Sequence, residues 1–344
     1  MEKKLTIALD AMGGDNAPSE IVKGAMLAIA EHSDMKVILV GDETAIQAEL
    51  KQYQYDQEQV EVIHTTEEIT CHESPVAAIR AKKDSSMVVA LNQVKDGKAD
   101  AFISAGSSGA ILAGGLFVVG RIKGVERAPL GCLFPTAKGA SMLVDCGANV
   151  DSKASQLVQY AKMGSIYMKH VMGVENPKVG LVNIGTEEEK GNALTKETYP
   201  LLKACTDINF IGNVEARELP AGEVDVAVCE AFTGNAILKT FEGTGKVLMK
   251  ELKGAMMKGT LSKIGALLIK KNLKEAMKKF DATEHGGAPL LGLNGLVVKC
   301  HGNASHKEIK NAMVQCISFV EQDINGKIKA FLELEKTEKN ASEE

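Results

Sequence analysis

Short apolar runs alternate with helix-like segments along most of the chain, and this order constrains the fold more than any other feature. The run at residues 5–10 (LTIALD) precedes a helical pattern at 19–32, and another helix is expected to open at Ser74-Pro75. Most runs are almost continuously apolar, as strands are when helices cover both faces of a sheet. The sequence therefore predicts an α/β fold with a mainly parallel sheet. Further candidate strands lie at 36–42, 60–65, 99–106, 141–149, 178–185, 208–214, 224–231 and 295–302.

The length of the chain suits one large α/β unit or two closely joined lobes, since 344 residues with 45% hydrophobic side chains can form a large core. The segment 128–146 contains two candidate strands without a helix between them, so a boundary is expected near 125–150. We expect one two-lobed catalytic domain over residues 1–335. The charged residues 336–344 are expected to form a disordered tail.

Charge and composition exclude several classes of protein. The net charge is −5 and tryptophan is absent, which disfavours a nucleic-acid partner. The seven cysteines are scattered without a CxxC pair, so neither a disulfide framework nor a zinc site is expected. The first residues lack the apolar core of a signal peptide, and no stretch of about 20 apolar residues occurs. These features predict a cytoplasmic protein.

Polar turns that contain glycine follow seven of the candidate strands. In open parallel sheets, the carboxyl ends of the strands border the crevice that binds ligands. Any one such turn is more often only a tight loop, but their repeated position predicts that they line a common cleft. The turns span residues 10–15, 104–110, 145–149, 183–192, 211–217, 229–235 and 300–305.

Small polar side chains and backbone amides in these turns suit a phosphate group. The chain contains no G-x-x-x-x-G-K-[ST] motif, no dinucleotide G-x-G-x-x-G and no G-x-S-x-G, so P-loop, Rossmann and serine-hydrolase chemistry are disfavoured. Ser107 and Ser108 enter the helix that follows and are candidates to contact phosphate; in the alternative interpretation, Ser108 only caps that helix. His301 is either an acid–base group or a hydrogen-bonded residue at a strand end. Cysteines beside the turns are expected to be buried thiols rather than nucleophiles.

Taken together, the motifs DAMGGDNAP, SAGSSGA, DCGAN, GTEEEKGN, IGNVEAR, AFTGN and GGAPLLGLNGLVVKCHG resemble, in this order, the phosphate acyltransferases of bacterial phospholipid synthesis. The resemblance extends over residues 5–325. It implies a two-lobed fold similar to phosphotransacetylases and isocitrate-dehydrogenase-like proteins, with a protruding helical hairpin, in a homodimer. It also implies transfer of a long acyl chain from acyl carrier protein to inorganic phosphate, with no cofactor and no metal.

The chemistry implied by the resemblance needs no side-chain nucleophile, because phosphate itself can attack a thioester. The protein must then position phosphate and stabilise an oxyanion. We expect Lys190, Asn192 and Asn235 to be catalytic, although each is equally compatible with a role in stabilising its loop. The expected substrate-binding residues are Asp10, Gly13, Gly14, Asp15, Ser107, Ser108, Asn149, Asn183, Asn213, Thr233 and His301.

The first turn places two glycines between two aspartates. Gly13 and Gly14 would let backbone amides approach phosphate or the thioester arm. Asp10 and Asp15 would be repelled by phosphate, so they are expected to accept backbone amides or orient a lysine. A magnesium site between them is a less favoured interpretation.

Residues 246–280 combine a basic and an apolar character. The window holds ten lysines and two glutamates, while Leu261, Ile264 and Leu268 follow helical spacing. Gly254, Gly259 and Gly265 are expected to interrupt it and form a helical hairpin. The hairpin suits the inner face of the plasma membrane, a dimer interface or an acidic acyl carrier protein, and the sequence does not separate these partners.

Three other functions remain open at this point. A short-chain phosphotransacetylase would use coenzyme A, although the basic apolar segment favours a lipid-linked substrate. A nicotinamide-dependent decarboxylating dehydrogenase lacks support because the chain has no dinucleotide signature and no cluster of metal-binding carboxylates. A non-catalytic membrane scaffold would leave the polar turns without a purpose.

Overall fold

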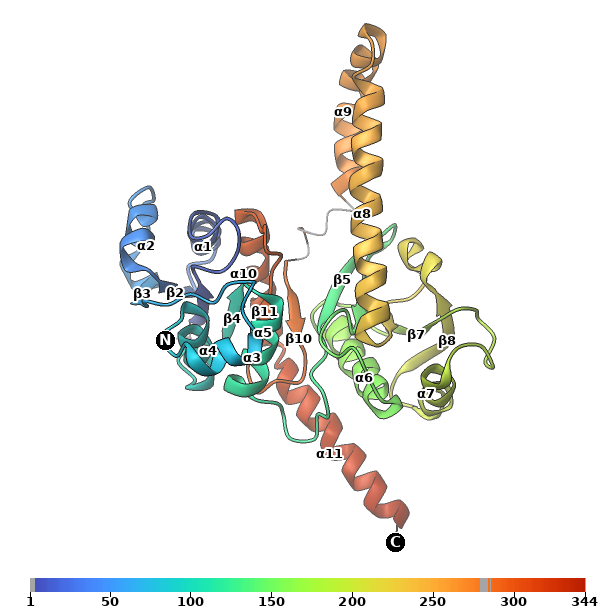
Figure 1. Ribbon diagram of the computed structural model, residues 1–344. Helices are drawn as coiled ribbons and strands as arrows, with labels where there is room; N and C mark the ends of the chain where they lie inside the picture. The colour runs from blue at the N-terminus through green and yellow to red at the C-terminus, as the bar shows by residue number, and fades with distance from the viewer. Residues whose placement is uncertain (1–3, 279–283, 285, 344) are drawn as a thin grey trace. The chain divides into compact units, whose positions relative to one another are not determined.

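Two compact α/β units make up the chain (Figure 1). The computed structural model describes residues 4–278, 284 and 286–343. Unit 1 comprises Met1–Gly131, Ile166–Glu175 and Thr283–Glu344, and unit 2 comprises Cys132–Ser165 and Asn176–Ala282. The first boundary, after Gly131, lies inside the region 125–150 that the sequence indicated.

Unit 1 contains a six-stranded sheet in the order β10-β11-β4-β1-β2-β3. Neighbouring strands are parallel except for the antiparallel pair β10–β11. The sequence patterns missed β10, which has only three residues. The strands are β1 (Leu5–Asp10), β2 (Met35–Gly41), β3 (Val60–His64), β4 (Ala101–Ser104), β10 (Ala288–Leu290) and β11 (Leu296–Lys299).

Helices connect the strands of this first sheet. Helix α1 packs against α10, where Gly24 leaves no room for a side chain beside Ile309. The helix expected at Ser74-Pro75 is α3, and residues 336–343 lie within the bounds of α11. The helices are α1 (Ser19–Glu31), α2 (Glu43–Leu50), η1 (Gln57–Gln59), α3 (Pro75–Ala81), α4 (Ser86–Lys95), α5 (Ser108–Gly114), η2 (Gly115–Val119), α10 (His306–Glu321) and α11 (Ile324–Glu343).

Unit 2 is built on a five-stranded sheet in the order β5-β6-β9-β7-β8. The pairs β6–β9, β7–β9 and β7–β8 are parallel. Its first two strands follow each other without a helix, as the sequence predicted for 128–146. The strands are β5 (Gly131–Thr136), β6 (Gly139–Val144), β7 (Lys178–Asn183), β8 (Asn209–Glu215) and β9 (Val226–Val228). The helices are α6 (Ala154–His170), which continues into unit 1, α7 (Ala193–Ala204), η3 (Ala216–Ala221), α8 (Ala231–Met256) and α9 (Thr260–Lys278).

Burial along the strands explains why their sequences are so apolar. Every residue of β4 and of β9 is buried, and the last four residues of β1 and of β6 are buried as well. A strand with both faces covered cannot show an alternating pattern. The α/β class and the mainly parallel sheets predicted from these runs are therefore confirmed.

A long helical hairpin, formed by α8 and α9, extends away from the sheet of unit 2 (Figure 1). The turn between the helices contains Gly259, as predicted. In contrast, Gly254 lies inside α8 and Gly265 inside α9, so these two glycines do not interrupt the helices. Glycine lowers helix stability by only about 1 kcal/mol relative to alanine, and its neighbours here are good helix formers.

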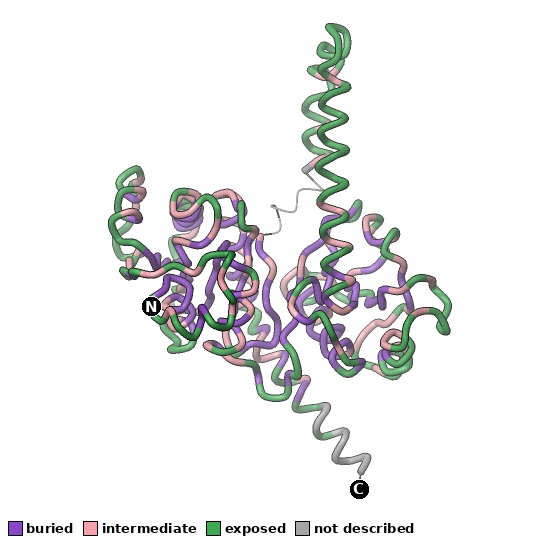
Figure 2. Tube along the Cα trace, in the orientation of Figure 1, coloured by how far each residue is buried: buried purple, intermediate pink, exposed green. Residues whose placement is uncertain are grey.

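Most of the hairpin is exposed (Figure 2). No helix among the described residues is long and apolar enough to cross a bilayer. Beyond the first turn of α8, the exposed large apolar side chains on the hairpin are Val247, Leu248, Met249, Leu252, Met257, Leu261, Ile264, Leu267, Leu268 and Ile269.

Candidate active site

In unit 1, the carboxylate of Asp10 lies buried where β1 ends. Its Oδ1 accepts a hydrogen bond from Ser86 Oγ at 2.6 Å, and its Oδ2 accepts one from Ser104 Oγ at 2.7 Å. Burial raises the pKa of the Asp10 carboxyl, and the two serine hydroxyls act in the opposite direction. The side chain is 2% exposed. Asp10 accepts hydrogen bonds from the backbone of Met12 and Gly13, as expected, and also from the two serine hydroxyls, which the sequence did not predict.

Close packing explains the two glycines that follow. A Cβ on Gly13 would lie 2.5 Å from Asp10 Oδ2 and 2.9 Å from the nitrogen of Gly106. Gly14 has φ of +104°, which side chains rarely adopt. Its neighbour Asp15 donates its backbone N–H to the carbonyl of Gly302 at 2.7 Å. The turns at 10–15, 104–110 and 300–305 are thereby held together in unit 1.

Three other predicted residues lie on these turns. Ser107 is the N-cap residue of α5 and is buried, but its side chain makes no capping hydrogen bond, while Ser108 is exposed. His301 is half-buried, and its backbone N–H donates to Glu308 Oε1 at 2.8 Å. The sequence missed Ser86 and Ser104. Ser104 lies at a strand end inside a quoted motif, whereas Ser86 begins α4 and carries no local signal.

In unit 2, the loop after β6 folds around the carboxylate of Asp145, which is fully buried. Oδ1 accepts the backbone N–H groups of Gly147 at 3.0 Å and Ala148 at 2.9 Å. Oδ2 accepts both the backbone and the side-chain N–H of Asn149, at 2.8 and 2.7 Å. The carboxylate thus fixes the loop, and it orients the buried side chain of Asn149 by holding its nitrogen.

The loop 183–192 is braced by two asparagines from neighbouring strands. Asn183 Nδ2 donates to the carbonyl of Lys190 at 3.1 Å, and Asn213 Nδ2 donates to the carbonyl of Glu187 at 2.8 Å. Gly191 has φ of +102°, and a Cβ there would overlap with Asn183 and Thr195. The amide groups of Asn183 and Asn213 are therefore used to shape the loop, although both were expected to contact substrate.

Two of the three predicted catalytic residues lie on this braced loop. Lys190 is exposed, and its Cγ packs beside Gly185. Asn192 is the N-cap residue of α7, where its Oδ1 accepts the N–H of Thr195 at 2.9 Å. Use of Oδ1 as a cap leaves the Nδ2 group of Asn192 as its hydrogen-bond donor. Both side chains thus present donors on a loop of fixed shape.

The start of α8 supplies Thr233 and Asn235. Glu230 is the N-cap residue, and its Oε1 accepts both the N–H and the hydroxyl of Thr233, at 3.2 and 2.6 Å. The hydroxyl of Thr233 is therefore part of the cap. A Cβ on Gly234 would lie 2.0 Å from the carbonyl oxygen of Asp145, so α8 begins in close contact with the loop after β6. Asn235 is exposed.

The cysteines near these loops are poorly suited to act as nucleophiles. Burial raises the pKa of the Cys229 thiol well above its usual range, and nearby Glu230 and Asp145 add to the effect. The pKa of Cys146 is also raised, first by its hydrogen bond with Cys132 and then by burial. A thiol must ionise to attack a carbonyl. The expected burial of these cysteines is confirmed.

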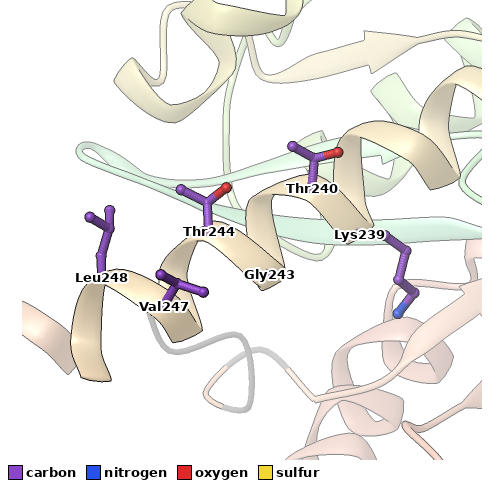
Figure 3. Close-up of a pocket in the computed structure, with 6 residues that line it drawn as sticks. All are labelled: Lys239, Thr240, Gly243, Thr244, Val247 and Leu248. Carbon is purple, nitrogen blue, oxygen red and sulfur yellow. The ribbon is translucent and has the colours of Figure 1, made fainter. Parts of the chain in front are cut away.

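A pocket of about 480 Å³ lies along one face of α8 (Figure 3). It is lined by side chains that recur with helical spacing, and none belongs to the predicted site. The lining residues are Lys239, Thr240, Gly243, Thr244, Val247 and Leu248. Phe241 lies within the same stretch of α8 and packs on Phe134 of β5, with ring centroids 4.2 Å apart.

The predicted turns thus form two groups. Three belong to unit 1, and the four at 145–149, 183–192, 211–217 and 229–235 belong to unit 2. Lys190, Asn192 and Asn235 are all in unit 2. Lys190 and Asn192 follow β7, Asn235 lies near the start of α8 after β9, and Asn149 follows β6, the other neighbour of β9. This group is the strongest candidate for the reaction centre.

Known proteins resemble this chain over nearly its whole length. A family model described as "Fatty acid synthesis protein" matches residues 5–327. The Phosphate acyltransferase of Alkaliphilus oremlandii (strain OhILAs) is 53% identical over 320 residues, which cover 93% of this chain and 95% of that protein. The Phosphate acyltransferase of Clostridium botulinum (strain Alaska E43 / Type E3) is 51% identical over 326 residues, covering 94% and 98%. A phosphotransacetylase from Streptococcus pyogenes superposes with a TM-score of 0.61 at 16% identity, covering 93% and 95%, a likeness of fold alone.

Proposed function

We propose a reaction for this chain from the premise that it belongs to the phosphate acyltransferase family. In this reaction, the enzyme moves a long-chain acyl group from acyl carrier protein to inorganic phosphate. The product is an acyl phosphate for phospholipid synthesis. The observation that carries the proposal is the exposure of Lys190 and Asn192 on a loop that Asn183 and Asn213 hold in shape. Preorganised donors of this kind stabilise the negative charge of an acyl-transfer transition state.

The proposed mechanism has no covalent enzyme intermediate. An oxygen of bound phosphate attacks the thioester carbonyl carbon, and the C–S bond then breaks. The sulfur leaves as the carrier thiolate, which takes a proton from water. The ammonium group of Lys190 offsets the charge of phosphate, while Asn192 and Asn235 donate hydrogen bonds to phosphate or to the developing oxyanion. The buried cysteines described above support direct attack, since none has a lowered pKa.

The test is phosphate-dependent release of carrier thiol from palmitoyl acyl carrier protein. We expect the rate to rise with phosphate concentration and saturate, and an acyl phosphate to form in equal amount. Acetyl-coenzyme A in the same assay distinguishes a short-chain phosphotransacetylase. A preference for acetyl-coenzyme A, or thiol release that does not depend on phosphate, would contradict the proposal.

We also assign the α8–α9 hairpin to the surface of an anionic membrane. Leu261, Ile264 and Leu268 are all exposed, and Leu261 is 86% exposed. The surrounding lysines suit anionic headgroups, and the apolar side chains suit the acyl boundary below them. A long-chain product gives such docking a purpose, because it would be released where the next lipid enzyme can take it.

Liposome flotation tests the membrane assignment. The protein is expected to float with vesicles of anionic phospholipid, and Leu261→Glu with Leu268→Glu is expected to reduce the bound fraction at least ~10-fold, because each glutamate places a charge in the apolar layer. Leu201→Glu with Leu334→Glu is the matched control, since both leucines are exposed outside the hairpin. Unchanged flotation of a folded hairpin variant would reject the assignment.

A further inference from the structure

Exposed apolar side chains follow the three central strands of the unit 2 sheet. Val150 is 62% exposed after β6, Phe232 is 70% exposed after β9, and Ile184 is 78% exposed after β7. All of β9 and the last four residues of β6 are buried, as are the four central residues of β7, and β9 lies between β6 and β7 in the sheet. We call Val150, Ile184 and Phe232 the apolar rim.

The backbone brings the members of the apolar rim to the same edge of the sheet. Val144 of β6 and Leu181 of β7 both pair with Val228 of β9, so β6 and β9 end level and β7 continues two residues further, with about 4.8 Å between neighbouring strands. The N–H of Ala231 donates to the carbonyl of Asn149 at 3.0 Å. Val150 and Phe232 are each the next residue along the chain from this bond. They are therefore held near each other by a fixed contact.

Each member of the rim is also next in sequence to a polar residue of the candidate site. Val150 follows Asn149, Ile184 follows Asn183, and Phe232 precedes Thr233. These polar side chains are hydrogen-bonded within their loops, while the apolar neighbours are turned toward water. Asn183 in turn holds the carbonyl of Lys190. The same three loops thus present polar donors and an uncovered apolar surface side by side.

We propose that the apolar rim binds the first methylene groups of the acyl chain, next to the reacting carbonyl. The proposal rests on the proposed function. A thioester held for attack at Lys190 and Asn192 has a polar carbonyl that continues directly into an apolar chain, so its binding site must change from polar to apolar within a few ångströms. The rim provides that change, and it is continuous with the loops that carry the donors.

The chain-length dependence of thiol release tests this assignment. Ile184→Ser and Phe232→Ala are compared with the wild type on palmitoyl and acetyl acyl carrier protein. The ratio of kcat/KM for palmitoyl over acetyl is expected to fall about 10-fold in each variant, because the rim contacts with the first methylene groups, which an acetyl group lacks, are lost. Leu201→Ser is the matched control, since Leu201 is an exposed apolar residue of α7 outside the polar turns. Its ratio is expected to stay at the wild-type value.

The possible outcomes distinguish a failure of the rim assignment from a failure of the proposed reaction. A wild-type enzyme without phosphate-dependent thiol release would overturn the proposed function itself. An active wild type whose ratio is unchanged in Ile184→Ser and Phe232→Ala would overturn only the rim. The same would follow if the control lowered the ratio equally, or if the rim variants changed only the oligomeric state in sedimentation. Thermal unfolding of each variant verifies that these exposed substitutions leave the fold intact.

Discussion

Replacing Lys190 by alanine is expected to lower kcat at least ~100-fold, the effect of losing one preorganised oxyanion donor. The loss of kcat should be large because Asn183 and Asn213 hold the loop 183–192 in a fixed shape. The backbone that carries the Lys190 ammonium group is therefore already positioned before the substrate binds. Stability should change by less than about 0.5 kcal/mol, since Lys190 is exposed. Steady-state thiol release at saturating phosphate measures the effect.

Lys138→Ala is the control for this experiment. Lys138 is also an exposed lysine of unit 2, but it forms a surface ion pair with Glu223 at 2.7 Å. Surface pairs of this kind contribute little, so its kcat should equal that of the wild type. A nearly normal kcat in Lys190→Ala would remove the lysine from the mechanism. A raised KM for phosphate with an unchanged kcat would mean that the lysine binds phosphate equally in the ground state and the transition state.

Replacing Asp145 by alanine is expected to have the largest effect on stability. Its carboxylate accepts hydrogen bonds from Gly147, Ala148 and both nitrogens of Asn149 in a fully buried position. Removing the carboxylate takes this acceptor from all four donors, and for the two buried ones, both on Asn149, an unpaired donor costs about 1–3 kcal/mol each. The free energy of unfolding should therefore fall by about 3 kcal/mol or more, as measured by urea denaturation. The loop beside the rim would also lose its shape, so activity should fall in the same variant.

Asp151→Ala separates this effect from a general sensitivity of the loop. Asp151 is an exposed aspartate only six residues further along the chain. Its removal should change the free energy of unfolding by no more than about 0.5 kcal/mol. Equal losses in the two variants would show that the hydrogen bonds to Asp145 do not hold the loop.

Local sequence patterns predicted the elements well where the physical cause was itself local. Continuous burial made β4 and β9 visible as apolar runs, and Gly259 marked the turn of the hairpin. The same patterns missed β10, because Pro289 lies in the middle of this edge strand and a proline argues against a strand. The patterns also predicted helix breaks at Gly254 and Gly265, which instead lie inside α8 and α9 because their neighbours are good helix formers.

Side-chain roles were less predictable, because their partners are distant in sequence. Asn183 and Asn213 have the residue type of a phosphate donor, yet their amide groups brace the loop that carries Lys190. Similarly, the hydroxyl of Thr233 donates a hydrogen bond to Glu230, the N-cap residue of α8. A sequence motif does not reveal whether a side-chain amide or hydroxyl already forms a hydrogen bond within the protein. That depends on which carbonyl or carboxylate the fold places within about 3 Å of it.

The order of strands and helices, and the polar turns at the strand ends, were determined by the sequence alone, because periodicity and glycine placement act over a few neighbouring residues. Only the tertiary structure decided which turns share a unit, and that Asp10 is satisfied by Ser86, 76 residues away. It also brought Val150, Ile184 and Phe232 to adjacent strand ends. Such contacts depend on strand pairing and packing across the whole sheet, which no local pattern encodes.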